Sequence, residues 1–115
     1  MDLQAALVKI QSIDPKETRS GWRTGLRDRA ILALLAARVS SIEVTKLQGR
    51  WIKRSGEGAL FVRIPGPPIK VYPIDPRLEE ALEKWLDHTG ARERPFLLFP
   101  GLAPSTVRRI KRSRG

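Results

Sequence analysis

Apolar residues recur at the spacing of an α-helix through the first half of the chain. Residues 2–11 carry them at every third or fourth position, which predicts a first helix. Residues 27–37 are apolar nearly all round, and this pattern predicts a second helix that is buried. A third helix is expected to start at Ser40 or Ser41, since serine is a favoured N-cap residue, and to run to about Gln48.

A further helix is predicted after Asp75, which supplies an N-cap and is followed by proline in the first turn. Its apolar positions follow the helical period as far as Gly90, a typical C-terminal residue. The opposite face of this helix is acidic, and we expect it to point away from any nucleic acid. Residues 14–24 contain proline, glycine and several charges, which predicts a surface loop.

The pattern then changes to the two-residue alternation of β-strands. Three strands of an antiparallel sheet are predicted, over residues 51–54, 59–64 and 69–74. In the third strand Lys70 alternates with Ile69 and Val71, and we expect Lys70 to lie on the solvent-facing side. Pro73 has no N–H to donate, so this strand should end there or lie at the edge of the sheet.

The last third of the chain predicts a short buried extended piece over residues 96–100 and a final helix that opens at Pro104. Residues 104–115 form a basic C-terminal helix or tail. The order of these elements predicts an α+β fold, with helices packed on a small three-stranded antiparallel sheet. At 115 residues the chain has the size of one domain, which spans residues 1–115.

Composition excludes several classes of protein. No apolar run approaches the roughly 20 residues that cross a bilayer, so we expect no membrane partner. The start of the chain has no secretory signal and the sequence has no cysteine, which favours a cytoplasmic or nucleoid location. Without a His/Cys cluster, a GxGxxG motif or a P-loop, no metal site and no cofactor are expected.

The strongest compositional signal is charge. The chain has 22 Lys and Arg against 12 Asp and Glu, a formal net charge of +10. A small domain with this charge binds a polyanion or belongs to a basic assembly; the alternative is a solvated basic surface. The basic residues form three groups: Lys16, Arg19, Arg23, Arg27 and Arg29; Lys53, Arg54, Arg63 and Lys70; and residues 108–114.

Residues 25–52 resemble the start of the catalytic domain of tyrosine recombinases, the phage integrases and their relatives. The opening Arg27-Asp28-Arg29, the apolar helix, and Glu43, Val44 and Leu47 in the next helix carry this resemblance. Later segments also match in order: the strand end Tyr72-Pro73-Ile74, the Pro95–Pro100 segment and the helix at Ser105–Arg112. The resemblance implies a fold similar to the first half of that domain, hence a truncated recombinase-like domain.

The residues that do chemistry in that family are missing from this sequence. Serine, at position 40 or 41, stands where the resemblance places the first catalytic arginine; Arg38 could replace it only if the helix end shifted by two residues. Pro65 stands at the position of the hairpin lysine. The histidine-x-x-arginine box is absent, and the single tyrosine, Tyr72, lies within a strand rather than on a C-terminal helix. The chain is therefore not expected to be an enzyme.

Binding is the function that remains. We expect a catalytically inactive DNA-binding protein, from a phage or mobile element, that contacts mainly the phosphate backbone of duplex DNA. The expected contact residues are Arg38, Lys53, Arg54, Arg63, Lys70, Arg108, Arg109, Lys111 and Arg112. The alternative is an inactive subunit or regulator that joins a full-length recombinase, another protein or copies of itself. Two weaker options are an enzyme that borrows a nucleophile from another chain and an RNA-associated basic protein.

Overall fold

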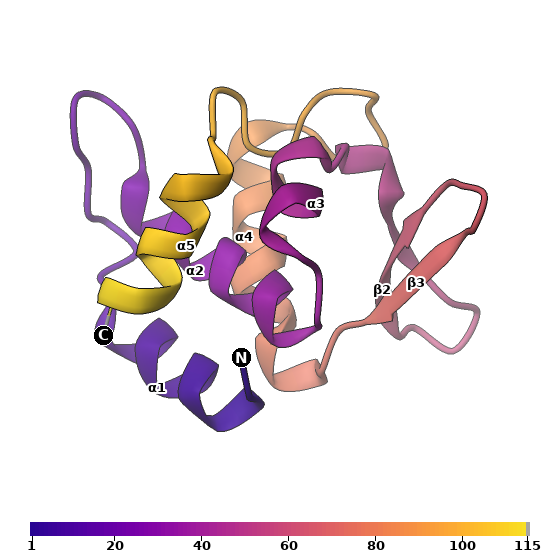
Figure 1. The fold of residues 1–115 in the computed structure, drawn as a ribbon, viewed down its shortest axis with the longest axis horizontal. Helices are drawn as coiled ribbons and strands as arrows, with labels where there is room; N and C mark the ends of the chain where they lie inside the picture. The colour runs from indigo at the N-terminus through magenta and orange to yellow at the C-terminus, as the bar shows by residue number, and fades with distance from the viewer. Residues whose placement is uncertain (115) are drawn as a thin grey trace.

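The computed structural model describes residues 1–114 and shows an α+β fold, as the sequence predicts. Helices surround a long buried helix, and a three-stranded antiparallel sheet projects to one side of them (Figure 1). In chain order the elements are α1 (Leu3–Ser12), α2 (Thr24–Ala36), α3 (Ser41–Lys46), the 3-10 helix η1 (Gly49–Trp51), β1 (Ile52–Arg54), β2 (Leu60–Ile64), β3 (Lys70–Pro73), the 3-10 helix η2 (Pro76–Leu78), α4 (Glu79–Thr89) and α5 (Pro104–Ser113).

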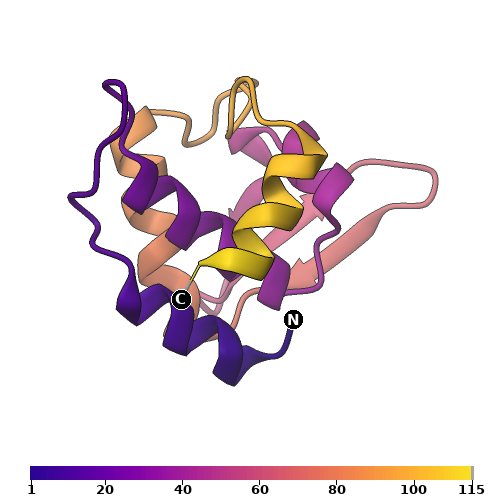
Figure 2. The same cartoon turned by 60° about the vertical axis from the view of Figure 1, so that its left-hand side comes forward.

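The buried helix is α2. It packs most extensively against α4 and α1 and also contacts α5 and α3, so its apolar residues meet a neighbour on every side. Ile31, Leu32 and Leu34 have no exposed surface. This explains the sequence pattern, because a helix that is apolar all round must be covered all round. The second view shows α2 and α4 on one side and α5 on the other (Figure 2).

Local sequence signals fix where the helices begin and end. The Ser40 side chain accepts a hydrogen bond from the Glu43 N–H, and the Glu43 carboxylate accepts one from the Ser40 N–H, which forms a capping box at α3. Asp75 caps η2, which leads directly into α4. α4 ends at Gly90, whose φ of +67° is left-handed and suits glycine. The predicted starts at Ser40 and Asp75 are confirmed.

The sheet has the order β1-β2-β3, and its register decides which side chains share a face. Lys70 pairs with Ile64, and Tyr72 with the fully buried Val62, so Lys70 and Tyr72 share the inner face that packs toward the helices. Val71 lies on the outer face, where 54% of it is exposed. Lys70 is exposed, as expected, with 51% of its side chain accessible, although it lies on the face that carries Val62 and Tyr72. The outer face of β3 carries the apolar Val71 instead.

Two loops differ from prediction. In residues 96–100 only Leu98 and Phe99 are buried, while Phe96 is 57% exposed. The Trp85 indole donates to the Leu98 carbonyl at 2.7 Å and stacks on Phe99, so these two residues are the ones drawn into the core. The loop at residues 14–24 contains a tight hairpin that the sequence reading did not resolve. Its two ends, Arg19 and Trp22, exchange both backbone hydrogen bonds at 2.9 Å.

Gly49 lies where the segment before β1 packs against the loop after α4, and a substitution there tests this packing. A Cβ at this position would lie 1.8 Å from the Ala91 carbonyl oxygen, which is backbone and cannot move aside cheaply. We expect Gly49→Ala to lower the free energy of unfolding by about 2–3 kcal/mol in urea denaturation. Gly56→Ala is the matched control, since nothing lies within 4 Å of its Cβ position; equal effects of the two substitutions would contradict this packing.

Candidate nucleic-acid interface

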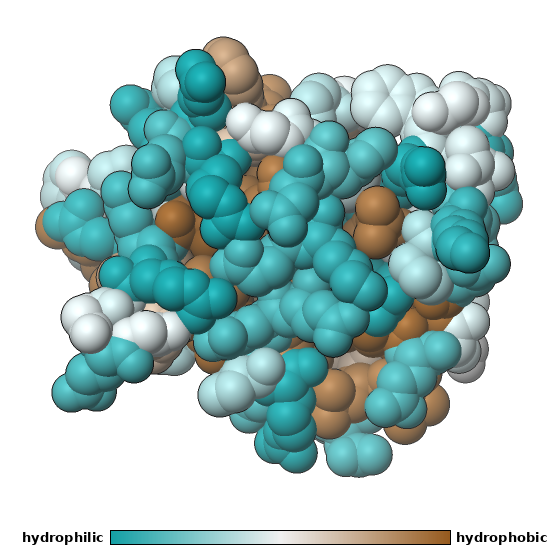
Figure 3. Space-filling model, turned by 180° about the vertical axis from the view of Figure 1, so that it is seen from behind, coloured by the Kyte–Doolittle hydropathy of each residue, from teal (hydrophilic) through white to brown (hydrophobic). Residues whose placement is uncertain are grey.

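Positive and negative charge lie on different helices. The charged side chains of α4 are four acidic residues, of which Glu79 and Glu83 are half-buried and Glu80 and Asp87 exposed, and the exposed Lys84. α5 carries no acidic residue, and its exposed basic side chains are Arg108, Arg109, Lys111 and Arg112. α2 separates the two helices, with α5 on the near side in Figure 1 and α4 behind it. The face seen from behind is largely hydrophilic (Figure 3).

α5 is oriented by two apolar side chains. Val107 and Ile110 are buried against the core, and at 100° per residue this turns Arg108, Lys111 and Arg112 outward. Arg38 follows α2 and is exposed. Burial lowers the pKa of the Met1 amino group, and the charges of Lys111 and Arg38 lower it further. We call Arg38, Arg108, Lys111 and Arg112 the basic face. None of the four has a carboxylate partner among residues 1–114.

The end of α5 is held by a buried ion pair. The Nε atom of Arg114 lies 3.0 Å from a carboxylate oxygen of Asp28 and forms an ion pair with it, although the geometry at Nε is not that of a hydrogen bond. Asp28 is only 4% exposed. Arg114 also donates a hydrogen bond to Glu17, and Arg27 donates one to Asp28. The basic residues from Arg108 to Arg114 therefore belong to an ordered, anchored helix and not to a frayed, solvated tail. Arg27, one of the first basic group in the sequence, is thus paired with a carboxylate.

The basic group predicted on the sheet is divided between its two faces. Lys53 and Arg63 lie on the outer face, exposed and without carboxylate partners in the described chain. Arg54 points to the other side and forms ion pairs with Glu79 at 3.4 Å and Glu83 at 3.2 Å. The sequence reading grouped these residues by their position in the chain. The pleat separates them, and the glutamates of α4 neutralise Arg54.

Glu43 is the centre of the polar contacts between α3 and the sheet. The Tyr72 hydroxyl donates to its carboxylate at 2.9 Å, and Lys70 lies 3.2 Å from it. Burial raises the pKa of Glu43, but hydrogen bonds from Ser40, Tyr72 and Lys70 outweigh burial and hold the pKa below its ordinary value. Burial first, and then the Glu43 carboxylate, raise the pKa of Tyr72. Lys70 is therefore partly neutralised, and Tyr72 is occupied by a structural contact.

The positions that the recombinase resemblance assigns to chemistry are thus used for structure. Ser40 caps α3 and Ser41 is its first residue. Arg38 has a φ of +80° at the end of α2, which makes it the left-handed residue between two helices. Pro65 lies in the exposed turn between β2 and β3. These contacts explain how the chain folds around the four positions.

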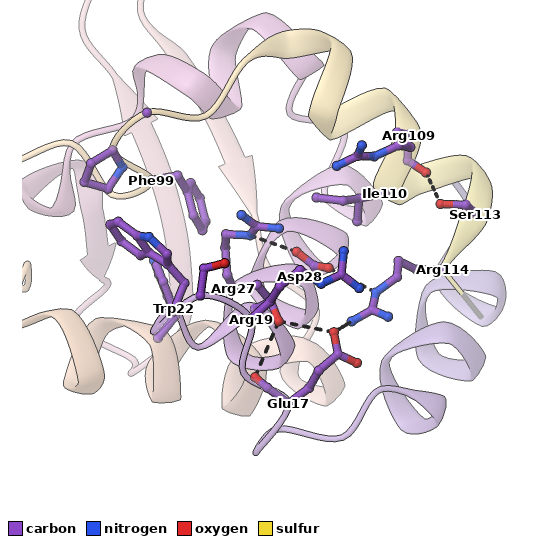
Figure 4. Close-up of a pocket in the computed structure, with 15 residues that line it drawn as sticks. Glu17, Arg19, Trp22, Arg27, Asp28, Phe99, Arg109, Ile110, Ser113 and Arg114 are labelled. Atoms are coloured by element: carbon purple, nitrogen blue, oxygen red, sulfur yellow. Dashed lines mark hydrogen bonds and ion pairs between the residues drawn. The ribbon is translucent and has the colours of Figure 1, made fainter.

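Sequence reasoning missed a pocket between the loop of residues 14–23 and α5. Its volume is about 730 Å³, and residues from α2 and from the segment before α5 complete its walls. Figure 4 shows Trp22 and Phe99 at one end and Glu17, Asp28 and Arg114 at the other. The Ser-Gly pair between Arg19 and Trp22, a dipeptide typical of tight turns, indicates the hairpin at its edge but not the pocket itself.

No family model, no curated protein and no solved structure matches the chain. The resemblance to tyrosine recombinases therefore stays a prediction. Residues 1–114 contain no helix with the length and hydrophobicity needed to span a bilayer. Within the same residues, no three His, Cys, Asp or Glu side chains gather in a way that could hold a metal ion.

The single tyrosine gives a direct test of the Glu43 contacts. Because burial and Glu43 both disfavour the phenolate, Tyr72 should titrate above pH 10.0 in the folded protein, followed by absorbance at 295 nm. Stability from this contact is present below that pH and is lost as pH rises through the raised pKa. Glu43→Gln should move the midpoint back toward 10.0; an unchanged midpoint would show that Glu43 does not affect the phenol.

The buried ion pair predicts energetic coupling between Asp28 and Arg114. Arg114→Gln should lower the free energy of unfolding by about 1–3 kcal/mol, since it leaves the buried carboxylate with Arg27 alone. The same substitution in an Asp28→Asn background should cost about 1 kcal/mol less. Urea denaturation of the four proteins measures this coupling, and strictly additive effects would show that the two side chains do not interact.

Proposed function

We propose that this protein binds duplex DNA through its basic face and does not cleave it. The observation that carries the proposal is the unpaired positive charge of Arg38, Arg108, Lys111 and Arg112 on one side of α2, with the acidic helix α4 on the other. A polyanion is attracted to the side that carries the unpaired cations. On the α4 side each acidic side chain is ion-paired with Arg54, Lys84 or Arg92, so that side offers no comparable attraction. The protein would bind the phosphates, because the guanidinium group of arginine can donate two hydrogen bonds to phosphate oxygens. Such contacts do not depend on the base sequence.

Within this proposal, Arg54 and Lys70 leave the set of phosphate contacts, since glutamates already neutralise them. Lys53 and Arg63 remain as a second basic surface on the sheet. The recombinase-like character and the phage or mobile-element origin are part of the same proposal. They rest on the sequence resemblance together with the order of elements, three helices, a three-stranded sheet and two further helices, which agrees with it.

Lack of catalysis is supported by what surrounds the relevant side chains. Burial, and then the Glu43 carboxylate that accepts the hydrogen bond of its hydroxyl, raise the pKa of Tyr72 and disfavour the phenolate. Serine caps a helix where the resemblance places a phosphate-binding arginine. We therefore expect supercoiled plasmid to stay intact in the presence of the protein, with no covalent adduct on Tyr72.

The proposal predicts a strong dependence of DNA affinity on salt. If Arg38, Lys53, Arg63 and the α5 residues Arg108, Lys111 and Arg112 each contact a phosphate, the logarithm of affinity should fall with the logarithm of salt concentration at a slope of about −5. A mobility-shift titration with duplex DNA measures this slope. Structured RNA run as a competitor tests the polyanion class, because displacement by RNA at lower concentration than by DNA would assign the face to RNA.

Single substitutions on opposite sides of the molecule sharpen the test. Arg112→Gln should reduce the magnitude of the salt slope by about 0.9, the value expected for one lost phosphate contact. Lys84→Gln on α4 removes the same charge from the acidic side and should leave the slope unchanged. If both variants weaken binding equally, attraction depends on net charge alone and the basic face is not the interface.

A second candidate function is an inactive subunit or regulator that associates with a protein partner, such as a full-length recombinase or another copy of the chain. Exposed apolar side chains favour it: Ile69 and Val71 at the projecting hairpin are each 54% exposed. Sedimentation of the protein alone, and with a candidate recombinase, tests it. A monomer that does not associate with the recombinase would argue against this function.

A further inference from the structure

The pocket beside α5 combines aromatic and cationic side chains. Trp22, 57% exposed, stands at one end of it near Phe99, and the ion pair of Asp28 and Arg114 lies at the other (Figure 4). Its volume of about 730 Å³ falls within the range of roughly 300–1,000 Å³ that small-molecule sites occupy. A ligand that fills it therefore needs a flat apolar part and a charged part.

The charges that line the pocket leave a surplus of two guanidinium groups. Glu17 and Asp28 are neutralised by Arg114 and Arg27, through the ion pairs described above. Arg19 and Arg109 also line the pocket and have no ion-pair partner among residues 1–114. The charged part of the ligand is thus an anion, and two arginines suit a phosphate.

The hairpin of the loop presents the aromatic and cationic groups together. Arg19 and Trp22 exchange both backbone hydrogen bonds, as directly opposed residues of an antiparallel pair do, so their side chains leave the hairpin on the same side. The turn between them, Ser20-Gly21, has φ values of +52° and +81°, which fit a tight two-residue connection. The pair is thus placed at the pocket before any ligand arrives.

We propose that this pocket binds a nucleotide, with the base stacked on Trp22 and the phosphate held by Arg19 and Arg109. Stacking on an aromatic side chain tolerates every base because each has a π-face, and guanidinium groups add the contacts to phosphate. Around α5, Arg109 lies on the pocket side, whereas Lys111, about 200° further round the helix, points away from it. The inference is therefore independent of DNA binding by the basic face.

Calorimetric titration of the full chain with adenosine 5′-monophosphate tests the proposal. We expect saturable binding that is at least about tenfold tighter than that of adenosine or of inorganic phosphate, since each carries only half of the recognised groups. Equal affinity for inorganic phosphate would reduce the pocket to an anion site and overturn the proposal. Absence of saturable binding to the monophosphate would overturn it as well.

Variants assign the binding to the pocket. Trp22→Ala and Arg19→Gln lie in an exposed loop, and each should weaken binding of the monophosphate by about fivefold or more. Trp22→Phe keeps an aromatic face and should retain most of the affinity. Lys111→Gln, about 200° round α5 from Arg109, is the charge-matched control; a loss equal to that of Arg19→Gln would show unspecific attraction and overturn the proposal. Circular dichroism confirms that each variant is folded.

The same chemistry can come from a free nucleotide or from the end of a nucleic-acid strand. A short single strand with a 5′-phosphate, titrated against the wild type and Trp22→Ala, distinguishes the two sources. Tighter binding of the strand than of the monophosphate, lost in Trp22→Ala, would assign the pocket to a strand end. Tighter binding of the monophosphate would assign it to the free nucleotide.

Discussion

The position of α5 depends on one buried carboxylate. Asp28 is 4% exposed on α2, and it accepts contacts from Arg27 beside it and from Arg114 at the far end of the chain. Burial of an unpaired carboxylate is costly, so the arginine at the end of α5 must return to this point of α2. Such a pair adds little net stability compared with apolar packing, but it specifies which end of α5 meets which part of α2. Val107 and Ile110 then fix the rotation of the helix.

That rotation determines both proposed binding surfaces. One flank of α5 presents Arg108, Lys111 and Arg112 to solvent beside Arg38, and the other flank places Arg109 and Ser113 at the pocket. The distribution of charge follows from the same arrangement. α2 lies between α5 and α4, so the unpaired cations of α5 lie on one side of α2 and the acidic side chains of α4 on the other. This packing, and not the net charge of +10 alone, decides from which side a polyanion is attracted.

The sequence predicted the elements that depend on local chemistry. Ser40 and Asp75 cap helices where expected, because a cap is decided within four residues, and the all-apolar pattern of α2 correctly indicated burial. It failed where the answer depends on a distant partner. Nothing near Lys70 in the chain shows that it pairs with Glu43. Likewise, nothing near Arg54 in the chain shows that it pairs with Glu79 and Glu83 of α4.

The candidate site was predictable in part for the same reason. The exposure of Arg108, Lys111 and Arg112 follows from the period of α5 once its buried side is known. The pocket could not be predicted, because it joins a hairpin at Arg19 and Trp22 to a helix more than eighty residues later. Its residues share no motif or spacing; they are brought together by the contact between Arg114 and Asp28.

The central claim, that positive charge is presented on one side for binding duplex DNA, can be tested residue by residue. Amide chemical-shift mapping by NMR, with a short duplex titrated into labelled protein, reports which side approaches DNA. The account predicts that shifts concentrate at Arg38 and along α5, and that α4 from Glu79 to Thr89 stays unperturbed. Shifts that are spread evenly over both helices, or that are largest on α4, would contradict it.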